Sequence, residues 1–92
     1  MLQAWRETDD ALTAYAQAQR RRTEVVEAVR QNEIALASAR QRYAEGASDF
    51  LNVISAQSAL LNQRNALAQA DSQIAERLVE LYRVLGGGWS AV

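Results

Sequence analysis

The stretch YAEGASDF, residues 43–50, separates two long helix-forming segments. Gly46 is the first glycine of the chain, and the other three stand together at residues 86–88. Proline is absent, so no other strong helix breaker occurs before residue 86. A glycine in the left-handed conformation can end a helix, and Ser48 can accept hydrogen bonds from the free amides of the next one. We therefore predict a single turn, with Asp49 in the first turn of the second helix, where the helix dipole favours an acid.

The predicted fold class is all-α, an antiparallel two-helix coiled-coil hairpin. Its first helix covers about residues 2–45, its turn residues 46–48, and its second helix about residues 49–85. A glycine-rich tail is expected over residues 86–92, with Trp89 folded back onto the last helical turn. We expect residues 1–92 to be one hairpin and a fragment of a larger protein.

Apolar residues recur every seven positions along the second helix, the pattern of a coiled coil. The companion row, three positions before, begins at Phe50 and ends at Leu85 but is polar in its middle third. A flanking row from Ile54 to Tyr82 is largely apolar, which predicts a stripe wide enough to contact more than one neighbouring helix. The predicted packing seam consists of Val29, Leu36, Val53, Leu60, Leu67, Ile74 and Leu81.

Antiparallel closure about Ala47 sets the register, because residues whose numbers add up to about 96 then face each other. This register places Glu33 near Arg64 and predicts an ion pair between them. On the first helix the same period is weaker, and its companion row holds Trp5, Leu12 and Val26. The predicted facing pairs are Tyr43 with Val53, Leu36 with Leu60, Val29 with Leu67, and Tyr15 with Leu81.

The hairpin is expected to be marginal on its own. About ten large seam residues contribute roughly 1.5 to 3 kcal/mol each on burial, whereas ordering a residue costs on the order of 1 to 2 kcal/mol. Trp5, Trp89 and the apolar row of the second helix also need a partner. We therefore expect self-association into a helical bundle, as an antiparallel four-helix dimer of the isolated chain.

The composition argues against an enzyme, because the chain contains neither His nor Cys. A carboxylate cluster that binds a metal could form from two pairs at helical spacing, Glu24 with Glu27 and Glu76 with Glu80. We favour the alternative that these residues lie on solvated helix faces, and we expect no metal or cofactor. A net charge of −1 argues against nucleic acid, and residues 20–22, all Arg, point in different directions around a helix. Apolar runs are too short for a transmembrane helix.

Residues 42–64, RYAEGASDFLNVISAQSALLNQR, resemble the tip motif of TolC-type outer membrane factors, the exit ducts of tripartite efflux pumps and type I secretion systems. The motif is a Tyr, two variable residues and a Gly, then a hydrophobic pair and a Gln-containing helix of small residues. Residues 78–89, LVELYRVLGGGW, are similar to the close of the second repeat in the lipoprotein efflux branch. The matching residues of the motif are Tyr43, Gly46, Val53, Ile54, Ala56 and Gln57.

The resemblance implies the C-terminal periplasmic hairpin of a trimeric outer-membrane channel. Its turn would lie at the periplasmic tip and contact a periplasmic adaptor protein, with drug efflux, metal efflux and secretion as alternatives. Well-known members carry an Arg latch and acidic residues near the turn, where this chain has Ser48, Asn52 and Ser55. The candidate adaptor-contact and aperture residues are Tyr43, Glu45, Gly46, Ala47, Ser48 and Asp49.

A second hypothesis is a generic soluble coiled-coil domain for oligomerisation or scaffolding. The heptads fit this hypothesis equally well. It does not account for the small-residue turn, the broad apolar stripe or the Gly-Gly-Gly-Trp ending at residues 86–89.

Overall fold

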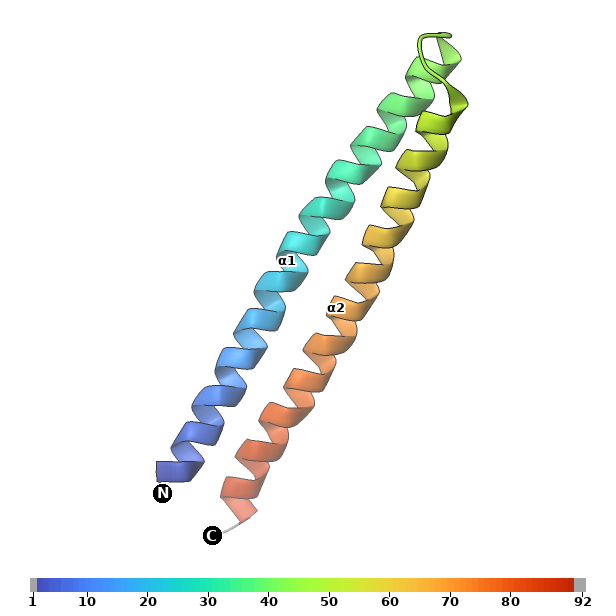
Figure 1. The fold of residues 1–92 in the computed structure, drawn as a ribbon. Helices are drawn as coiled ribbons and strands as arrows, with labels where there is room; N and C mark the ends of the chain where they lie inside the picture. The colour runs from blue at the N-terminus through green and yellow to red at the C-terminus, as the bar shows by residue number, and fades with distance from the viewer. Residues whose placement is uncertain (1, 91–92) are drawn as a thin grey trace. The chain divides into compact units, whose positions relative to one another are not determined.

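The computed structural model describes residues 2–90, and the side chains of residues 5–86. Helix α1 covers Leu2–Ala44 and helix α2 covers Phe50–Ser90 (Figure 1). No strand occurs among residues 2–90, so the predicted all-α hairpin is confirmed. The helices form two compact units, the turn unit, Thr23–Ala68, and the terminal unit, Met1–Arg22 with Gln69–Val92. Within each unit, a segment of α1 lies beside an antiparallel segment of α2 (Figure 1).

The turn after α1 is closed by main-chain hydrogen bonds around Gly46. This glycine has a φ of 74°, in the left-handed region that the sequence predicted. Its amide donates to the carbonyl of Tyr43 at 3.0 Å, and the amide of Ala47 donates to the carbonyl of Arg42 at 2.9 Å. Together these bonds form a Schellman motif, which satisfies two carbonyls at the end of α1.

The residue that caps α2 is Asp49, so the prediction of a Ser48 cap was wrong. Because α2 begins at Phe50, Asp49 holds the capping position, and its Oδ1 accepts a hydrogen bond from the amide of Leu51 at 3.5 Å. Ser48 lies one residue too early for this role. Its Oγ accepts a hydrogen bond from the side-chain amide of Asn52 at 2.6 Å. Ser48 thus stabilises the turn through a side chain of the first helical turn.

The glycine-rich segment at the end of α2 is helical and does not form the predicted tail. The helix continues through residues 86–88 and ends at Ser90, five residues beyond the expected bound. Glycine lowers helix stability by about 1 kcal/mol relative to alanine, but unlike proline it keeps the amide that the helix ladder needs. The predicted packing of Trp89, and residues 91–92 of the tail, lie outside what the structure describes.

The core of the turn unit lies where α1 and α2 face each other. Leu36, Val53 and Leu60 are buried there in a single cluster, which brings Leu36 and Leu60 together as the register predicted. Val29, Ala39 and Ala56 pack against this cluster and are partly buried. The seam of this unit thus alternates large aliphatic residues with alanine.

The companion positions that are best buried beside the seam hold alanine, and the prediction that Phe50 belongs to them was wrong. On α2 the companions are Ala56, which is partly buried, and Ala70, which is buried; both follow the Val53 row by three positions, whereas Phe50 of the predicted row is exposed. Small side chains allow two helix axes to approach closely, and a larger residue then has no space between them. On α1, Ala11 and Ala18 are buried in the same way, while Trp5, Leu12 and Val26 are exposed.

The terminal unit has a core made mainly of alanine. Among its described side chains, Ala11, Ala18 and Ala70 are buried, and Ile74 and Leu81 of the predicted seam are half-buried. Neither α1 nor α2, over the residues described, combines the length and apolar character needed to cross a membrane.

Candidate interaction surfaces at the turn and along the helices

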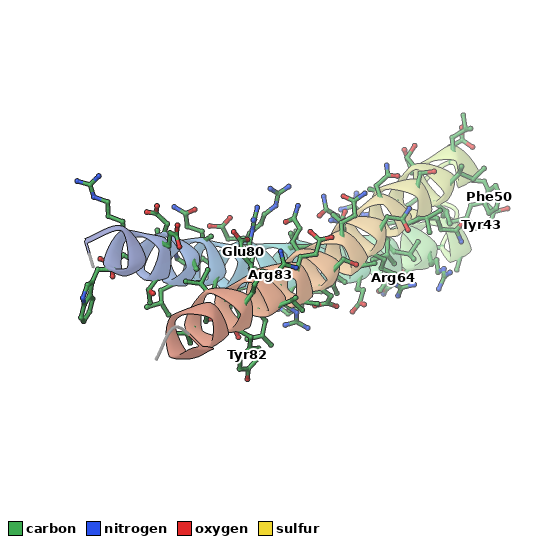
Figure 2. All side chains as sticks on the ribbon, turned by 90° about the horizontal axis from the view of Figure 1, so that it is seen from below. Tyr43, Phe50, Arg64, Glu80, Tyr82 and Arg83 are labelled. Atoms are coloured by element: carbon green, nitrogen blue, oxygen red, sulfur yellow. The ribbon has the colours of Figure 1, made fainter. Side chains whose placement is uncertain are left out.

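The turn carries an aromatic pair formed by the last residues of α1 and the first residue of α2. The ring centroids of Tyr43 and Phe50 lie 5.2 Å apart with the planes tilted by 54°, a favourable geometry for aromatic rings. Both side chains are 49% exposed, and Figure 2 shows them next to each other at the turn. The pair therefore links the two helices and still presents apolar surface to solvent.

The other residues predicted at the turn lie around this pair. Glu45, Gly46, Ala47 and Asp49 are exposed, and Ser48 is half-buried. Of these, Glu45 accepts a hydrogen bond from the side-chain amide of Gln41 at 3.3 Å. The structure thus places all six predicted turn residues within one short segment of the surface.

Sequence reasoning missed two exposed residues of the turn, Phe50 and Leu51. Phe50 had been assigned to the seam because of its heptad position, although it contacts Tyr43 at the end of the seam. Leu51 is 64% exposed beside it. The sequence signal that could have identified them is their position directly after the Asp49 cap. A large residue in the first turn of α2 lies close to the end of α1, where it can remain exposed.

All seven residues of the predicted packing seam are at least partly buried. Leu36, Val53 and Leu60 are buried, and the remaining four are half-buried. The half-buried residues of the seam are Val29, Leu67, Ile74 and Leu81.

Among the side chains that the structure describes, two ion pairs join α1 to α2. The predicted pair of Glu33 and Arg64 is confirmed at 3.5 Å in the turn unit, but both side chains are more than half exposed, so it lies at the edge of the seam. In the terminal unit Arg22 pairs with Asp71, which sequence reasoning did not identify. Exposed pairs of this kind contribute about 0 to 1 kcal/mol each. They agree with the predicted antiparallel register and add little to the stability of the fold.

A third pair lies on α1 alone. Arg30 donates to Glu27 at 2.6 Å, and Gln31 donates to the same carboxylate at 3.1 Å. The hydrogen bond from Arg30, followed by that from Gln31, lowers the pKa of Glu27 from 4.5 to about 2. Glu27 is therefore engaged within its own helix, and no group of three or more possible metal ligands gathers among the described residues.

The flanking row of α2 remains exposed along its whole length. Ile54, Leu61 and Tyr82 are its large members, and Figure 2 shows Tyr82 projecting away from the helices. On α1, Ile34 and Val26 are also exposed. The two helices cannot cover these side chains, because their common seam is already filled by the aliphatic and alanine rows.

This combination, a hairpin with a filled seam, an ordered turn and uncovered apolar rows, is typical of a helix pair that packs against further helices. The family model of the outer membrane efflux protein matches residues 1–87. The chain therefore belongs to the outer membrane efflux protein family, as its resemblance to TolC-type factors implied.

Curated relatives agree with this assignment. The chain is 33% identical over 91 residues to the pyoverdine export outer membrane protein OpmQ of Pseudomonas putida KT2440, covering 99% of this chain and 19% of that protein. It is 32% identical over 87 residues to the solvent efflux pump outer membrane protein SrpC and to the toluene efflux pump outer membrane protein TtgI, both also from Pseudomonas putida. These matches cover 95% of this chain and 18% of each relative.

The chain thus spans about a fifth of the length of the curated relatives it matches. The names of these relatives describe export and efflux and not an enzymatic reaction. No solved structure matches the chain significantly.

Proposed function

We propose that this chain is a periplasmic helical hairpin in the wall of an outer-membrane channel that serves efflux or secretion. The observation that carries the proposal is that large apolar side chains stay exposed on a hairpin whose own seam is filled. Lateral packing against further hairpins would cover those side chains and build a duct wall. Cargo would pass by conduction, with no chemical step on this chain.

The turn is the proposed contact with a periplasmic adaptor protein. Tyr43 and Phe50 supply exposed apolar surface there, and the acids Glu45 and Asp49 flank them with charge. An exposed aromatic pair with a polar rim is a common composition for the centre of a protein interface. The loop between the two aromatic side chains includes Gly46, Ala47 and Ser48. The adaptor would therefore contact the whole segment from Tyr43 to Leu51.

The assembly proposed for the longer protein is a homotrimer in the outer membrane, with this segment in the periplasm. The isolated chain is proposed to form a dimer through the same apolar rows. The names of the relatives, which describe the export of pyoverdine, solvents and toluene, favour efflux over secretion. A soluble coiled-coil domain unrelated to membranes would not account for the family match over residues 1–87.

The turn hypothesis is tested by substituting Gly46 in the longer protein. Valine at a φ of 74° is strained, although no atom lies within 4 Å of the added Cβ, so G46V should disturb the turn through its backbone alone. Asparagine tolerates this conformation, which makes G46N the matched control. We expect G46V to lose adaptor co-purification and efflux, and G46N to keep both.

Normal efflux and adaptor binding by a G46V protein that reaches the outer membrane in wild-type amount would refute the role assigned to the turn. The position of the hairpin is tested separately by adding single cysteines to this cysteine-free segment. In cells that lack the adaptor, labelling of a cysteine at Glu45 by a thiol reagent confined to the periplasm is the expected outcome, and protection from it in those cells would count against the proposed location.

A further inference from the structure

The terminal unit contains a small cavity between its segments of α1 and α2. The cavity has a volume of about 210 Å³, and two of its lining residues are alanines of α1, the half-buried Ala14 and the buried Ala18. Pockets for drug-sized ligands measure about 300 to 1,000 Å³, so this cavity suits a small molecule. Its other lining residues are polar: Gln17, Arg21, Gln73 and Arg77.

The polar lining consists of two matched pairs, one from each helix. In each pair a glutamine precedes an arginine by four positions, which places both side chains on one face of their helix. The two helix segments are antiparallel, and the Arg22–Asp71 ion pair joins residues whose numbers add up to about 93. At this register each arginine of the cavity lies about level with the glutamine of the opposite helix. The pairs are Gln17 with Arg21 on α1 and Gln73 with Arg77 on α2.

The cavity lining offers hydrogen-bond donors and no carboxylate. Guanidinium groups and side-chain amides all carry N–H groups that can donate. Among the side chains that the structure describes, none forms a hydrogen bond or ion pair with the side chain of Gln17, Arg21 or Gln73. Arg77 donates from Nη1 to Glu80 at 3.0 Å, which leaves the other N–H groups of its guanidinium available. The cavity therefore presents unused donors to a molecule that enters it.

The charge around the cavity is positive on the α1 side. Residues 11–23 of α1 include three arginines and no acid. The facing segment of α2, residues 69–80, has three acids, of which Asp71 and Glu80 are paired with arginines. The third, Glu76, does not line the cavity. The positive charge of α1 is therefore not cancelled at the cavity, which favours an anion there.

We propose that this cavity binds the carboxylate group of a small molecule. Arg21 and Arg77 contact the carboxylate from the two helices through charge-assisted hydrogen bonds, because the planar guanidinium group matches the two oxygens of a carboxylate. Since Glu80 offsets the charge of Arg77, the cavity keeps a charge of about +1. That charge matches one carboxylate better than the roughly −1.5 to −2 of a phosphate monoester. The site goes beyond the proposed channel function and does not require it.

Titration of the 92-residue chain with benzoate tests the site, with benzamide as a neutral analogue of nearly the same shape. The side-chain amide signals of Gln17 and Gln73, followed by nuclear magnetic resonance at constant ionic strength, should shift and saturate with benzoate. The side-chain amide of Gln57, which lies in the turn unit, should not shift. We expect binding in the millimolar range, because exposed ion pairs are weak, and at least fivefold weaker binding of benzamide.

Two arginine variants separate the cavity from the general positive charge of α1. R21Q removes a lining residue, whereas R20Q removes the same charge from the neighbouring residue, which does not line the cavity. We expect R21Q to weaken benzoate binding at least fivefold and R20Q less than twofold, with both variants as helical as the wild type. E80Q, which releases Arg77 from its ion pair, should strengthen binding at least twofold.

Several outcomes would overturn the carboxylate site. Equal weakening by R20Q and R21Q would show a general attraction of anions to α1. Equal binding of benzoate and benzamide, shifts that do not saturate, or tighter binding of phenyl phosphate than of benzoate would also contradict the proposal. Weaker self-association of R21Q without benzoate binding would mean that an acidic side chain of a second copy occupies the cavity in place of a small molecule.

Discussion

Tyr43 at the end of α1 and Phe50 at the start of α2 form a tilted ring pair with a centroid distance of 5.2 Å and join the two helices outside the buried seam. An aromatic pair in this geometry contributes about 0.5 to 1.5 kcal/mol beyond the area that it buries. We expect a double-mutant cycle of Y43A and F50A to give a coupling energy in that range. Urea unfolding followed by circular dichroism measures it, and the neighbouring L51A variant should show no coupling to Y43A.

Gly46 should be needed for its backbone conformation alone. A Cβ at this position meets no atom within 4 Å, so the cost of G46A comes from the left-handed φ of 74°. That cost is about 1 to 2 kcal/mol for a residue other than glycine, and less for asparagine. Chemical unfolding should give the highest free energy of unfolding for the wild type, a lower one for G46N and the lowest for G46A. Equal free energies of unfolding for all three proteins would argue against a strained turn.

Leu60 and Leu61 are neighbours with opposite environments, 5% and 60% exposed. Truncation of a buried leucine costs about 2 to 5 kcal/mol, whereas an exposed one costs little in a monomer. We expect L60A to lower the free energy of unfolding of the dilute chain by at least 2 kcal/mol and L61A by less than about 0.5 kcal/mol. A large effect of L61A that grows with chain concentration would instead report its contact with a second copy.

The Glu33–Arg64 ion pair should contribute little and should depend on salt. Both side chains are more than half exposed at a separation of 3.5 Å, and such pairs measure about 0.2 to 1 kcal/mol. A cycle of E33Q and R64Q should give a coupling energy within that range at low salt, and it should fall toward zero in 1 M NaCl. A coupling energy that stays constant with salt would indicate a desolvated pair, contrary to the structure.

Glu27 should make the fold sensitive to acid. Its pKa is about 2 in the folded chain against an ordinary value of 4.5, because Arg30 and Gln31 donate to the ionised carboxylate. Because the pKa of Glu27 is lower in the folded chain than in the unfolded chain, ionised Glu27 stabilises the fold at a pH above about 4.5. This stabilisation is lost as the pH falls from about 4.5 toward 2. Helicity measured by circular dichroism in mild urea should therefore drop less between pH 5 and pH 2 in E27Q than in wild type.

A few signals in the sequence were enough to predict the fold, but they did not predict the details of packing between the helices. One glycine between two heptad patterns was enough to predict the hairpin, and the register was accurate enough to place Glu33 beside Arg64. The heptad pattern did not show which residues beside the Val53 row would be buried between the helices. Hydrophobicity favoured Phe50, which is exposed, whereas close approach of the helices favours alanine, as at Ala56 and Ala70.

The candidate turn residues were also predicted only in part. The resemblance of residues 43–54 to a known tip motif identified the loop, but a motif written along the chain does not show contacts across a turn. Phe50 was therefore counted with the wrong surface, and Ser48 was given the cap that Asp49 supplies. The cap was misassigned because α2 begins at Phe50, one residue later than predicted, and Phe50 was misassigned because a heptad position does not show where the seam ends.

The Schellman closure of the turn depends on main-chain atoms of Arg42, Tyr43, Gly46 and Ala47. Apart from the left-handed conformation of Gly46, this closure does not depend on the exposed side chains of Glu45 and Ala47. Mutations at these two positions can therefore accumulate without unfolding the loop. The charge and size of the surface at the loop can therefore change while the loop and the helices keep their conformation.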